Sequence, residues 1–133
     1  MPLPSDVDRE VATGQYGSVV FAVKSDERMA EAWYWKANLP KKKWKSFESL
    51  CKRLVNEGFI INEEQFKLLH DDVFEFKRGG DRLLCFRVGK RWLLTNALKK
   101  SGRKNITDDI NKSTTIGEKH LEWERSQEKK LTK

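Results

Sequence analysis

Two glycine turns divide residues 73–97 into three short segments in which apolar and polar side chains alternate. The turns fall at Gly79-Gly80 and at Gly89, and the segments are Val73–Lys77, Arg82–Val88 and a third from Lys90 or Arg91 to Ala97. A period of two is typical of strands, and glycine at such turns is typical of hairpins. The pattern therefore predicts a three-stranded antiparallel meander, which every other element has to accommodate.

A helical hairpin is predicted ahead of the meander. Between residues 44 and 55 apolar side chains recur at spacings of three and four, and Gly58 follows them as a C-terminal cap. They are Trp44, Phe47, Leu50, Cys51, Leu54 and Val55. A preceding helix is predicted from Ser25 to Ala37, because Pro40 must end it. Asn62 is predicted to cap a short helix over residues 63–69.

Two more elements complete the expected fold. Residues 18–23 are β-branched and aromatic, which predicts a first strand, and a last helix is predicted to open at Asn105 or Thr107, with Gly117 weakening its middle. The expected class is α+β. We expect a small antiparallel sheet, made of the first strand and the C-terminal three-stranded meander. An N-terminal helical hairpin and a C-terminal helix pack on one face of it.

The 133 residues predict one domain, which spans residues 17–128. Residues 1–16 are expected to form a flexible N-terminal arm, and residues 129–133 a frayed charged tail. No apolar run approaches the roughly 20 residues that a membrane span needs. The N-terminus also lacks the apolar centre of a signal peptide. We therefore expect a cytoplasmic protein without membrane contact.

Positive charge is concentrated in one part of the chain. Residues 77–104 hold ten Lys and Arg and one acid, Asp81, so their balance is +9, whereas the whole chain sums to +7. The remainder is therefore slightly acidic. A concentrated cationic surface attracts polyphosphates, because neutralising the phosphates releases condensed counterions. Since the same residues are predicted to form the sheet, the sequence predicts a basic sheet face.

Cysteine and histidine are too few and too scattered to predict a metal site. Cys51 and Cys85 each have apolar neighbours and are predicted to be small buried thiols. His70 and His120 are predicted to be structural or surface residues. Neither a metal nor a cofactor is expected.

Short sequence motifs in and around the meander resemble those of a known family. Five pieces carry the resemblance, in this order: Val73-Phe74-Glu75-Phe76-Lys77, Gly79-Gly80, Asp81-Arg82, Leu93-Leu94 and Ala97-Leu98-Lys99-Lys100-Ser101. Together they resemble the RelE/ParE superfamily, the toxins of type II toxin–antitoxin systems, and among these the HigB-like, phage-derived branch. The resemblance covers roughly residues 18–125 and implies a RelE-like fold.

This resemblance implies a ribosome-dependent endoribonuclease that cuts mRNA without a metal and leaves a 2′,3′-cyclic phosphate. It also implies two partners, the mRNA on the ribosome and a cognate antitoxin, expected to be a helix-turn-helix protein. The 2′-hydroxyl attacks the scissile phosphate, which requires a base, an acid and cations that stabilise the charge on phosphorus.

The resemblance also places the candidate site residues. We expect the catalytic group to be Lys77, Arg82, Lys100 and Arg103. Arg82 follows a tight turn, where a planar guanidinium can grip two phosphate oxygens. Further contacts with RNA are expected from Arg91, Trp92, Lys99, Lys104, Lys41, Lys42 and Lys43. Glu75 is expected either to act as a base or to form a salt bridge with a neighbouring strand.

Other functions stay open at this point. Asp81 stands where many family members have an aromatic residue, and no tyrosine follows Tyr34. A non-catalytic module that binds nucleic acid or protein with the same face is therefore an alternative, and a ParE-like topoisomerase inhibitor is a third. Cleavage of a translated message, salt-dependent binding without cleavage, and loss of supercoiling would distinguish the three.

Overall fold

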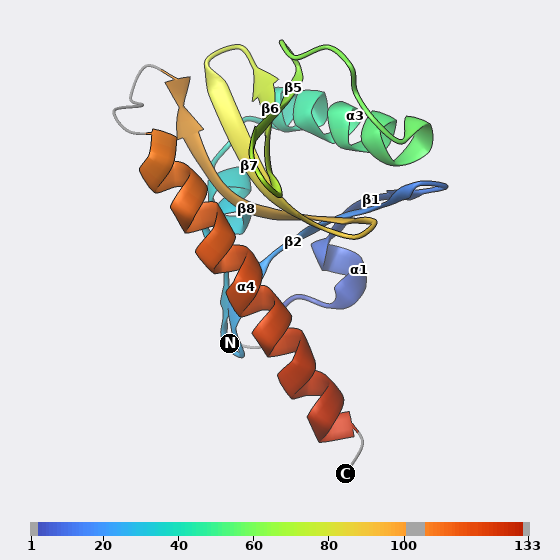
Figure 1. Ribbon diagram of the computed structural model, residues 1–133, viewed down its shortest axis with the longest axis vertical. Helices are drawn as coiled ribbons and strands as arrows, with labels where there is room; N and C mark the ends of the chain where they lie inside the picture. The colour runs from blue at the N-terminus through green and yellow to red at the C-terminus, as the bar shows by residue number, and fades with distance from the viewer. Residues whose placement is uncertain (1–2, 101–105, 132–133) are drawn as a thin grey trace.

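The computed structural model describes residues 3–100 and 106–131, which form a twisted sheet with helices on both faces (Figure 1). The sheet has six strands in the order β1-β2-β8-β7-β6-β5. Their bounds are β1 (Glu10–Gly14), β2 (Gly17–Phe21), β5 (Phe66–His70), β6 (Val73–Arg78), β7 (Asp81–Val88) and β8 (Arg91–Lys99). The predicted meander is confirmed as β6-β7-β8.

The expected small antiparallel sheet is wrong, although the chain is α+β. Strand β2 runs parallel to β8, with Ser18 opposite Arg91 and Phe21 opposite Leu94. Two strands that were not predicted widen the sheet, β1 beside β2 and β5 beside β6. The sheet is therefore six-stranded and mixed.

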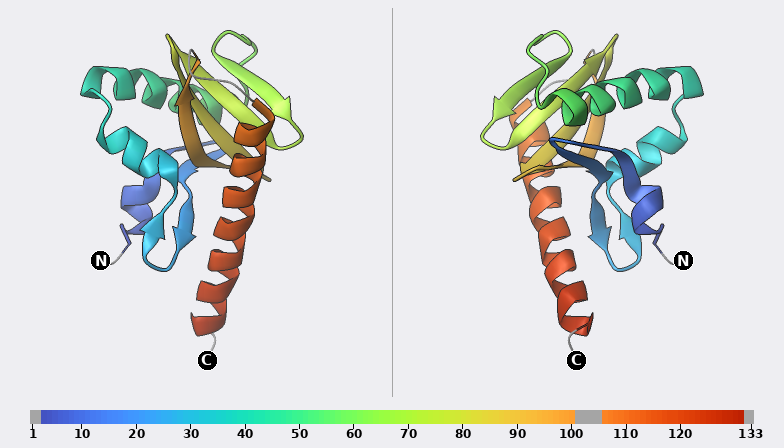
Figure 2. Two further views of the ribbon diagram at one scale, coloured as in Figure 1. Left: turned by 90° about the vertical axis from the view of Figure 1, so that its left-hand side faces the viewer. Right: turned by 90° about the vertical axis from the view of Figure 1, so that its right-hand side faces the viewer.

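Helices cover both faces of the sheet, whereas one covered face was predicted. On one side lie α2 (Glu31–Ala37) and α3 (Lys41–Glu57), and on the other α4 (Ile106–Leu131), as Figure 2 shows. The short α1 (Asp6–Arg9) precedes β1, and a separate hairpin of β3 (Val23–Ser25) and β4 (Arg28–Met29) packs beside α4. No helix within residues 3–100 and 106–131 combines the length and apolar character needed to cross a bilayer.

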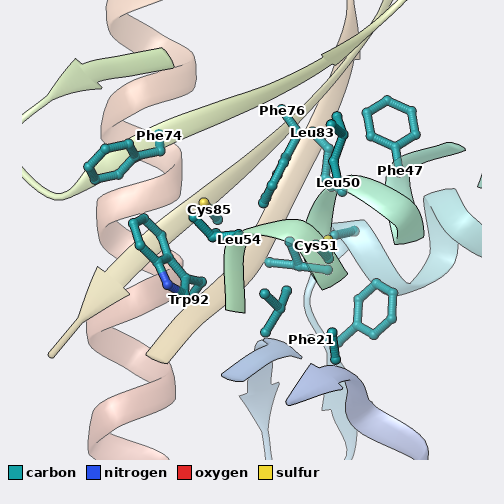
Figure 3. Packing of buried hydrophobic residues seen from close by; sticks show 14 of the residues in the cluster. Phe21, Phe47, Leu50, Cys51, Leu54, Phe74, Phe76, Leu83, Cys85 and Trp92 are labelled. Carbon is teal, nitrogen blue, oxygen red and sulfur yellow. The ribbon is translucent and has the colours of Figure 1, made fainter. Parts of the chain in front are cut away.

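Helix α3 confirms the clearest helix prediction. Its periodic residues Phe47, Leu50 and Leu54 are buried, and Gly58 ends the helix with a left-handed φ of 88°. The side chains pack against Phe76, Leu83 and other inward residues of the sheet (Figure 3). Both cysteines lie in this core, as predicted. Burial raises the pKa of each thiol, so both stay protonated and take no part in surface chemistry.

Three local predictions differ from the structure. Residues 26–27 form the turn between β3 and β4, so the helix expected from Ser25 begins only at Glu31. Residues 66–69, expected to lie in a short helix over residues 63–69, form edge strand β5 (Phe66–His70). Residues 6–14, expected in a flexible arm, form α1 and β1. The last helix is confirmed, but it continues to Leu131, through part of the tail that was expected to fray.

Helix α4 is held against the sheet by a second, smaller core. Ile116 packs with Leu93, Ala22 and Ala30. A register shift between β7 and β8 adds buried polar groups there: the Thr95 hydroxyl donates to the Leu84 carbonyl at 3.2 Å and lies 2.6 Å from the Ser113 hydroxyl of α4. These contacts fix the first turns of α4 over the meander.

Candidate functional site

A hollow of about 410 Å³ opens between the meander and the start of α4. It lies on the face that α4 covers. It is lined by Lys67, Leu68, Leu69, Glu75, Lys77, Arg82, Lys100, Ile106 and Ile110. The residues come from β5, β6, β7, the end of β8 and α4, so the fold brings together side chains that are far apart in the sequence.

Strand register explains why these charges share the hollow. Lys77 on β6 stands directly opposite Arg82 on β7, and Lys67 on β5 stands opposite Glu75 on β6. Side chains two apart on one strand lie on the same face. Glu75 and Lys77 therefore point the same way, and their cross-strand partners point with them. Lys100 is held near the same turn because its amide donates to the Gly80 carbonyl at 2.8 Å.

Arg82 is the most strongly positioned cation in the hollow. Its side chain is only 8% exposed, and its Nη1 donates to the carbonyls of Gly79 at 2.8 Å and of Asp81 at 2.9 Å. Its Nε lies 3.8 Å from Oε1 of Glu75, whose side chain is 1% exposed. The salt bridge expected for Glu75 with a neighbouring strand is thus confirmed. Because the carbonyls of the adjacent turn hold the buried guanidinium, its positive charge has one fixed position and orientation in the hollow.

The charges of the hollow suit a phosphodiester. Lys67, Lys77, Arg82 and Lys100 supply four positive groups against the single carboxylate of Glu75. Such a set can hold phosphate oxygens and stabilise charge that develops on them. The carboxylate and the ammonium groups can also accept and donate protons. The hollow therefore combines groups that can bind a phosphate with groups that can transfer protons.

The predicted catalytic residues fall together where they are described. Lys77, Arg82 and Lys100 line the hollow, whereas Arg103 lies outside the described residues. The sequence did not single out Lys67 or the apolar wall of Ile106 and Ile110. The sequence does not reveal Lys67 as a site residue, because the predicted helix over residues 63–69 includes it. In a strand paired with β6, Lys67 lies beside Glu75.

The predicted RNA-binding residues are more scattered. Lys99 lies on the opposite face of the sheet, where its ammonium group is 3.3 Å from Oδ1 of Asp81. Lys42 and Lys43 lie on that side too, at the start of α3, and Lys41 lines a different surface hollow beside Trp44. Lys104 lies outside the residues that the structure describes.

Arg91 and Trp92 have structural partners at the far end of the meander. Arg91 forms two hydrogen bonds with Glu124 of α4, at 2.6 and 2.7 Å. Trp92 is only 4% exposed and packs edge-on against Phe66 and Phe74 in the main core. The prediction that Trp92 offers a stacking surface to RNA is therefore wrong, because its strand position points the indole toward α3.

A second cluster of ionisable groups surrounds His120, away from the hollow. The imidazole Nδ1 accepts a 2.9 Å hydrogen bond from the Val23 amide, and Nε2 lies 3.4 Å from Glu124 but outside hydrogen-bond geometry. Burial lowers the pKa of His120, and the positive charges of Arg91 and Arg9 act in the same direction against an opposing effect of Glu124. Burial alone raises the pKa of Glu124, but the hydrogen bond from Arg91 and the positive charges of Arg91 and His120 together outweigh it, so that pKa is lowered overall.

This cluster predicts a loss of stability in mild acid. The folded-state pKa of His120 lies below its ordinary value of 6.5, so the unfolded chain binds the proton more readily. Stability is then fully present above about pH 6.5 and falls as the pH drops toward the folded-state pKa. His120→Asn should flatten this slope, because an amide oxygen can accept the Val23 N–H without titrating. Urea unfolding at pH 7.5, 6.5 and 5.5 measures it.

His70→Asn is the matched control, because His70 is 68% exposed and pairs only with its neighbour Asp71 among its described contacts. It should keep the wild-type slope. If His70→Asn flattened the slope and His120→Asn did not, the buried imidazole would not be the source.

Within residues 3–100 and 106–131, no three or more His, Cys, Asp or Glu side chains are grouped so that they could hold a metal ion. Comparison with known proteins adds no identity to this geometry. No protein-family model matches the chain, and a search of curated proteins found no match to it.

Proposed function

We propose that the hollow binds a phosphodiester of RNA and that the protein is a metal-independent, ribosome-dependent mRNA endoribonuclease, the toxin of a toxin–antitoxin pair. One observation carries the proposal. Lys77, Arg82 and Lys100, chosen from the sequence for a phosphate site, line one hollow together with Glu75. The resemblance to the HigB-like branch of the RelE/ParE toxins supplies the substrate, the helix-turn-helix antitoxin, the phage-derived origin and the cytoplasmic location as parts of this proposal.

In the proposed reaction the 2′-oxygen of a ribose attacks the adjacent phosphorus and the P–O5′ bond breaks. The 2′-hydroxyl proton passes to the Glu75 carboxylate, which lies in the hollow beside Arg82. The leaving 5′-oxygen takes a proton from Lys77 or Lys100. Arg82 binds the non-bridging oxygens, whose negative charge increases in the transition state. The products are a 2′,3′-cyclic phosphate and a free 5′-hydroxyl, so no water enters this step.

Replacement of two cations of the hollow, the half-buried Lys77 and the exposed Lys100, tests the proposal. Lys77→Ala with Lys100→Ala should lower the rate of message cutting on the order of 10²-fold, because phosphate charge loses two stabilising groups. Primer extension on a message translated in an extract, followed over time, gives the rate. Expression of the wild-type protein should arrest bacterial growth, and the double variant should relieve the arrest.

Lys24→Ala with Lys90→Ala is the matched control, because it removes two exposed cations that do not line the hollow. It should cut and arrest growth like the wild type. Normal growth with abundant wild-type protein, and an uncut message, would contradict the proposal. Loss of supercoiling without message breaks would point instead to topoisomerase inhibition.

One observation favours a second candidate, a non-catalytic RNA-binding module. Arg82 already donates to two carbonyls of its own turn and pairs with Glu75, which reduces the charge that it can offer to a phosphate. No tyrosine follows Tyr34 to assist proton transfer. Under this candidate the protein binds RNA with steep salt dependence, while the message in the translating extract stays intact.

A further inference from the structure

We propose that single-stranded RNA crosses the Gly79-Gly80 turn, and that a second cationic pocket beyond the turn binds the sugar-phosphate backbone next to the nucleotide in the hollow. The inference rests on the proposed RNA site and extends it to an adjacent backbone subsite. The second pocket has a volume of about 530 Å³ and lies on the α3 side of the sheet. It is lined by Pro40, Lys42, Lys43, Ser46, Phe47, Arg78, Gly79, Gly80 and Asp81.

The strand period places cations on both sides of the same turn. Arg78 stands opposite Asp81 next to the turn, and Lys77 stands opposite Arg82 one residue further away. Neighbouring residues on a strand point to opposite faces. Lys77 and Arg82 therefore line the hollow under α4, and Arg78 and Asp81 line the pocket beside α3.

Lys99 and Lys100 divide in the same way at the end of β8. Lys100 lines the hollow, whereas Lys99 pairs with Asp81 on the α3 side. The tip of the β6-β7 hairpin is therefore bracketed by positive groups on both faces, with α3 and the start of α4 on opposite sides of it (Figure 2).

The second pocket keeps a net positive charge despite Asp81. Its cations are Lys42, Lys43 and Arg78, with Lys99 at its edge. The Asp81 side chain is 6% exposed and lies 3.6 Å from the Lys43 ammonium group and 3.3 Å from that of Lys99. It therefore orients two lysines toward the turn and neutralises only one charge. The first turn of α3 contains no acidic residue that would offset the rest.

The bare turn between the two pockets is the strongest sign of a ligand path. Gly79 has a φ of 54°, which favours glycine, but Gly80 has no positive φ and a Cβ there would meet no atom within 4 Å. The other hairpin of the meander has Lys90 at the equivalent second position, after Gly89 with a φ of 60°. The turn geometry therefore permits a side chain at position 80, and its absence leaves the backbone open to close approach.

Gly80→Leu tests the path without altering either set of cations. A side chain on the bare turn should leave thermal stability within the range of the wild type, because the site is open. It should weaken binding of a fluorescent hexauridylate at least tenfold. Binding of the dinucleotide UpU, which needs only one pocket, should change less than twofold. Lys90→Leu places the same side chain on the other turn and should leave both affinities unchanged.

Lys42→Gln with Lys43→Gln tests the second pocket itself. Hexauridylate binding should weaken, and the slope of log affinity against log salt should decrease by about 0.7 for each phosphate that the variant no longer neutralises. UpU binding should not change. Lys77→Ala with Lys100→Ala should weaken both ligands, since every bound strand must fill the hollow.

Equal losses for UpU and hexauridylate, or no loss in Gly80→Leu, overturn the crossing path. These outcomes are separate from failure of the proposed reaction. Length-dependent binding that Gly80→Leu abolishes, with an intact message in the translating extract, supports the path and refutes cleavage. Message cutting that Gly80→Leu and the double glutamine variant leave unchanged supports cleavage and refutes the path.

Discussion

Arg82→Ala is expected to lower the free energy of unfolding by about 3–5 kcal/mol, because it leaves the carboxylate of Glu75 buried without this counter-charge. The two side chains are 8% and 1% exposed and their charged atoms lie 3.8 Å apart, so solvent screens the pair little. The change also removes the two hydrogen bonds to the turn carbonyls. Urea unfolding at neutral pH, compared with wild type, gives the difference.

The double variant Glu75→Leu with Arg82→Met separates stability from function. It removes both charges and keeps similar volume, and such replacements of buried ion pairs are often neutral or stabilising. It should therefore unfold near the wild-type urea concentration and still fail to cut a translated message. If Arg82→Ala were no less stable than this double variant, the pair would not be buried and coupled as the structure has it.

Gly117→Val is expected to lower the free energy of unfolding by about 3 kcal/mol or more, because α4 has no room for a side chain where it crosses β7. A Cβ at position 117 would lie 2.3 Å from Cδ2, 2.4 Å from Cγ and 2.9 Å from Cβ of Phe86. A change of the Phe86 χ1 angle can move Cδ2 and Cγ away, but it leaves Cβ in place. Helix α4 must then move away from the sheet, which also displaces Ile106 and Ile110 from the wall of the hollow.

Gly117→Ala separates the clash from helix propensity, because propensity alone predicts that this change raises the free energy of unfolding by about 1 kcal/mol. We expect a loss instead. Asn111→Ala, at an exposed position of the same helix, is the control and should raise stability slightly. In a Phe86→Ala background the cost of Gly117→Ala should shrink, which a double-mutant cycle measures. Two equal gains from Gly117→Ala and Asn111→Ala would mean that α4 does not pack against Phe86.

The sequence predicted correctly those elements in which the local sequence pattern and the tertiary contacts favour the same secondary structure. Helix α3 has an apolar stripe and a capping glycine, and the meander has alternation and glycine turns. Asn62 shows the opposite case. Its side chain accepts from the Glu64 amide at 2.9 Å, the same contact that would start a helix, but here it forms a turn. Strand β5 is then fixed by β6, whose Lys77 amide donates to the Gln65 carbonyl.

The sequence predicted the charges of the hollow better than its shape. Lys77 and Arg82 could be paired because one short turn separates them. The wall of Ile106 and Ile110 depends on where α4 crosses the sheet. The buried contact of Thr95 with Ser113 and the close approach of Gly117 to Phe86 set this crossing, and no local sequence pattern marks the register shift that places Thr95. Residues 25–30 were misread for a similar reason. Asp26 is an acid that suits a helix start, but it lies in the turn between β3 and β4. There its carboxylate accepts a hydrogen bond from the Gln127 side chain of α4.

The parallel pairing of β2 with β8 has a consequence for how the chain reaches this structure. Ser18 and Arg91 are partners although 73 positions separate them. A contact of such long sequence separation must close a large loop before it contributes stability, and proteins rich in such contacts fold slowly. During synthesis the β1-β2 hairpin emerges first and waits for its neighbour until the meander has left the ribosome. The N-terminal hairpin should therefore join the sheet late, as one of the last steps of folding.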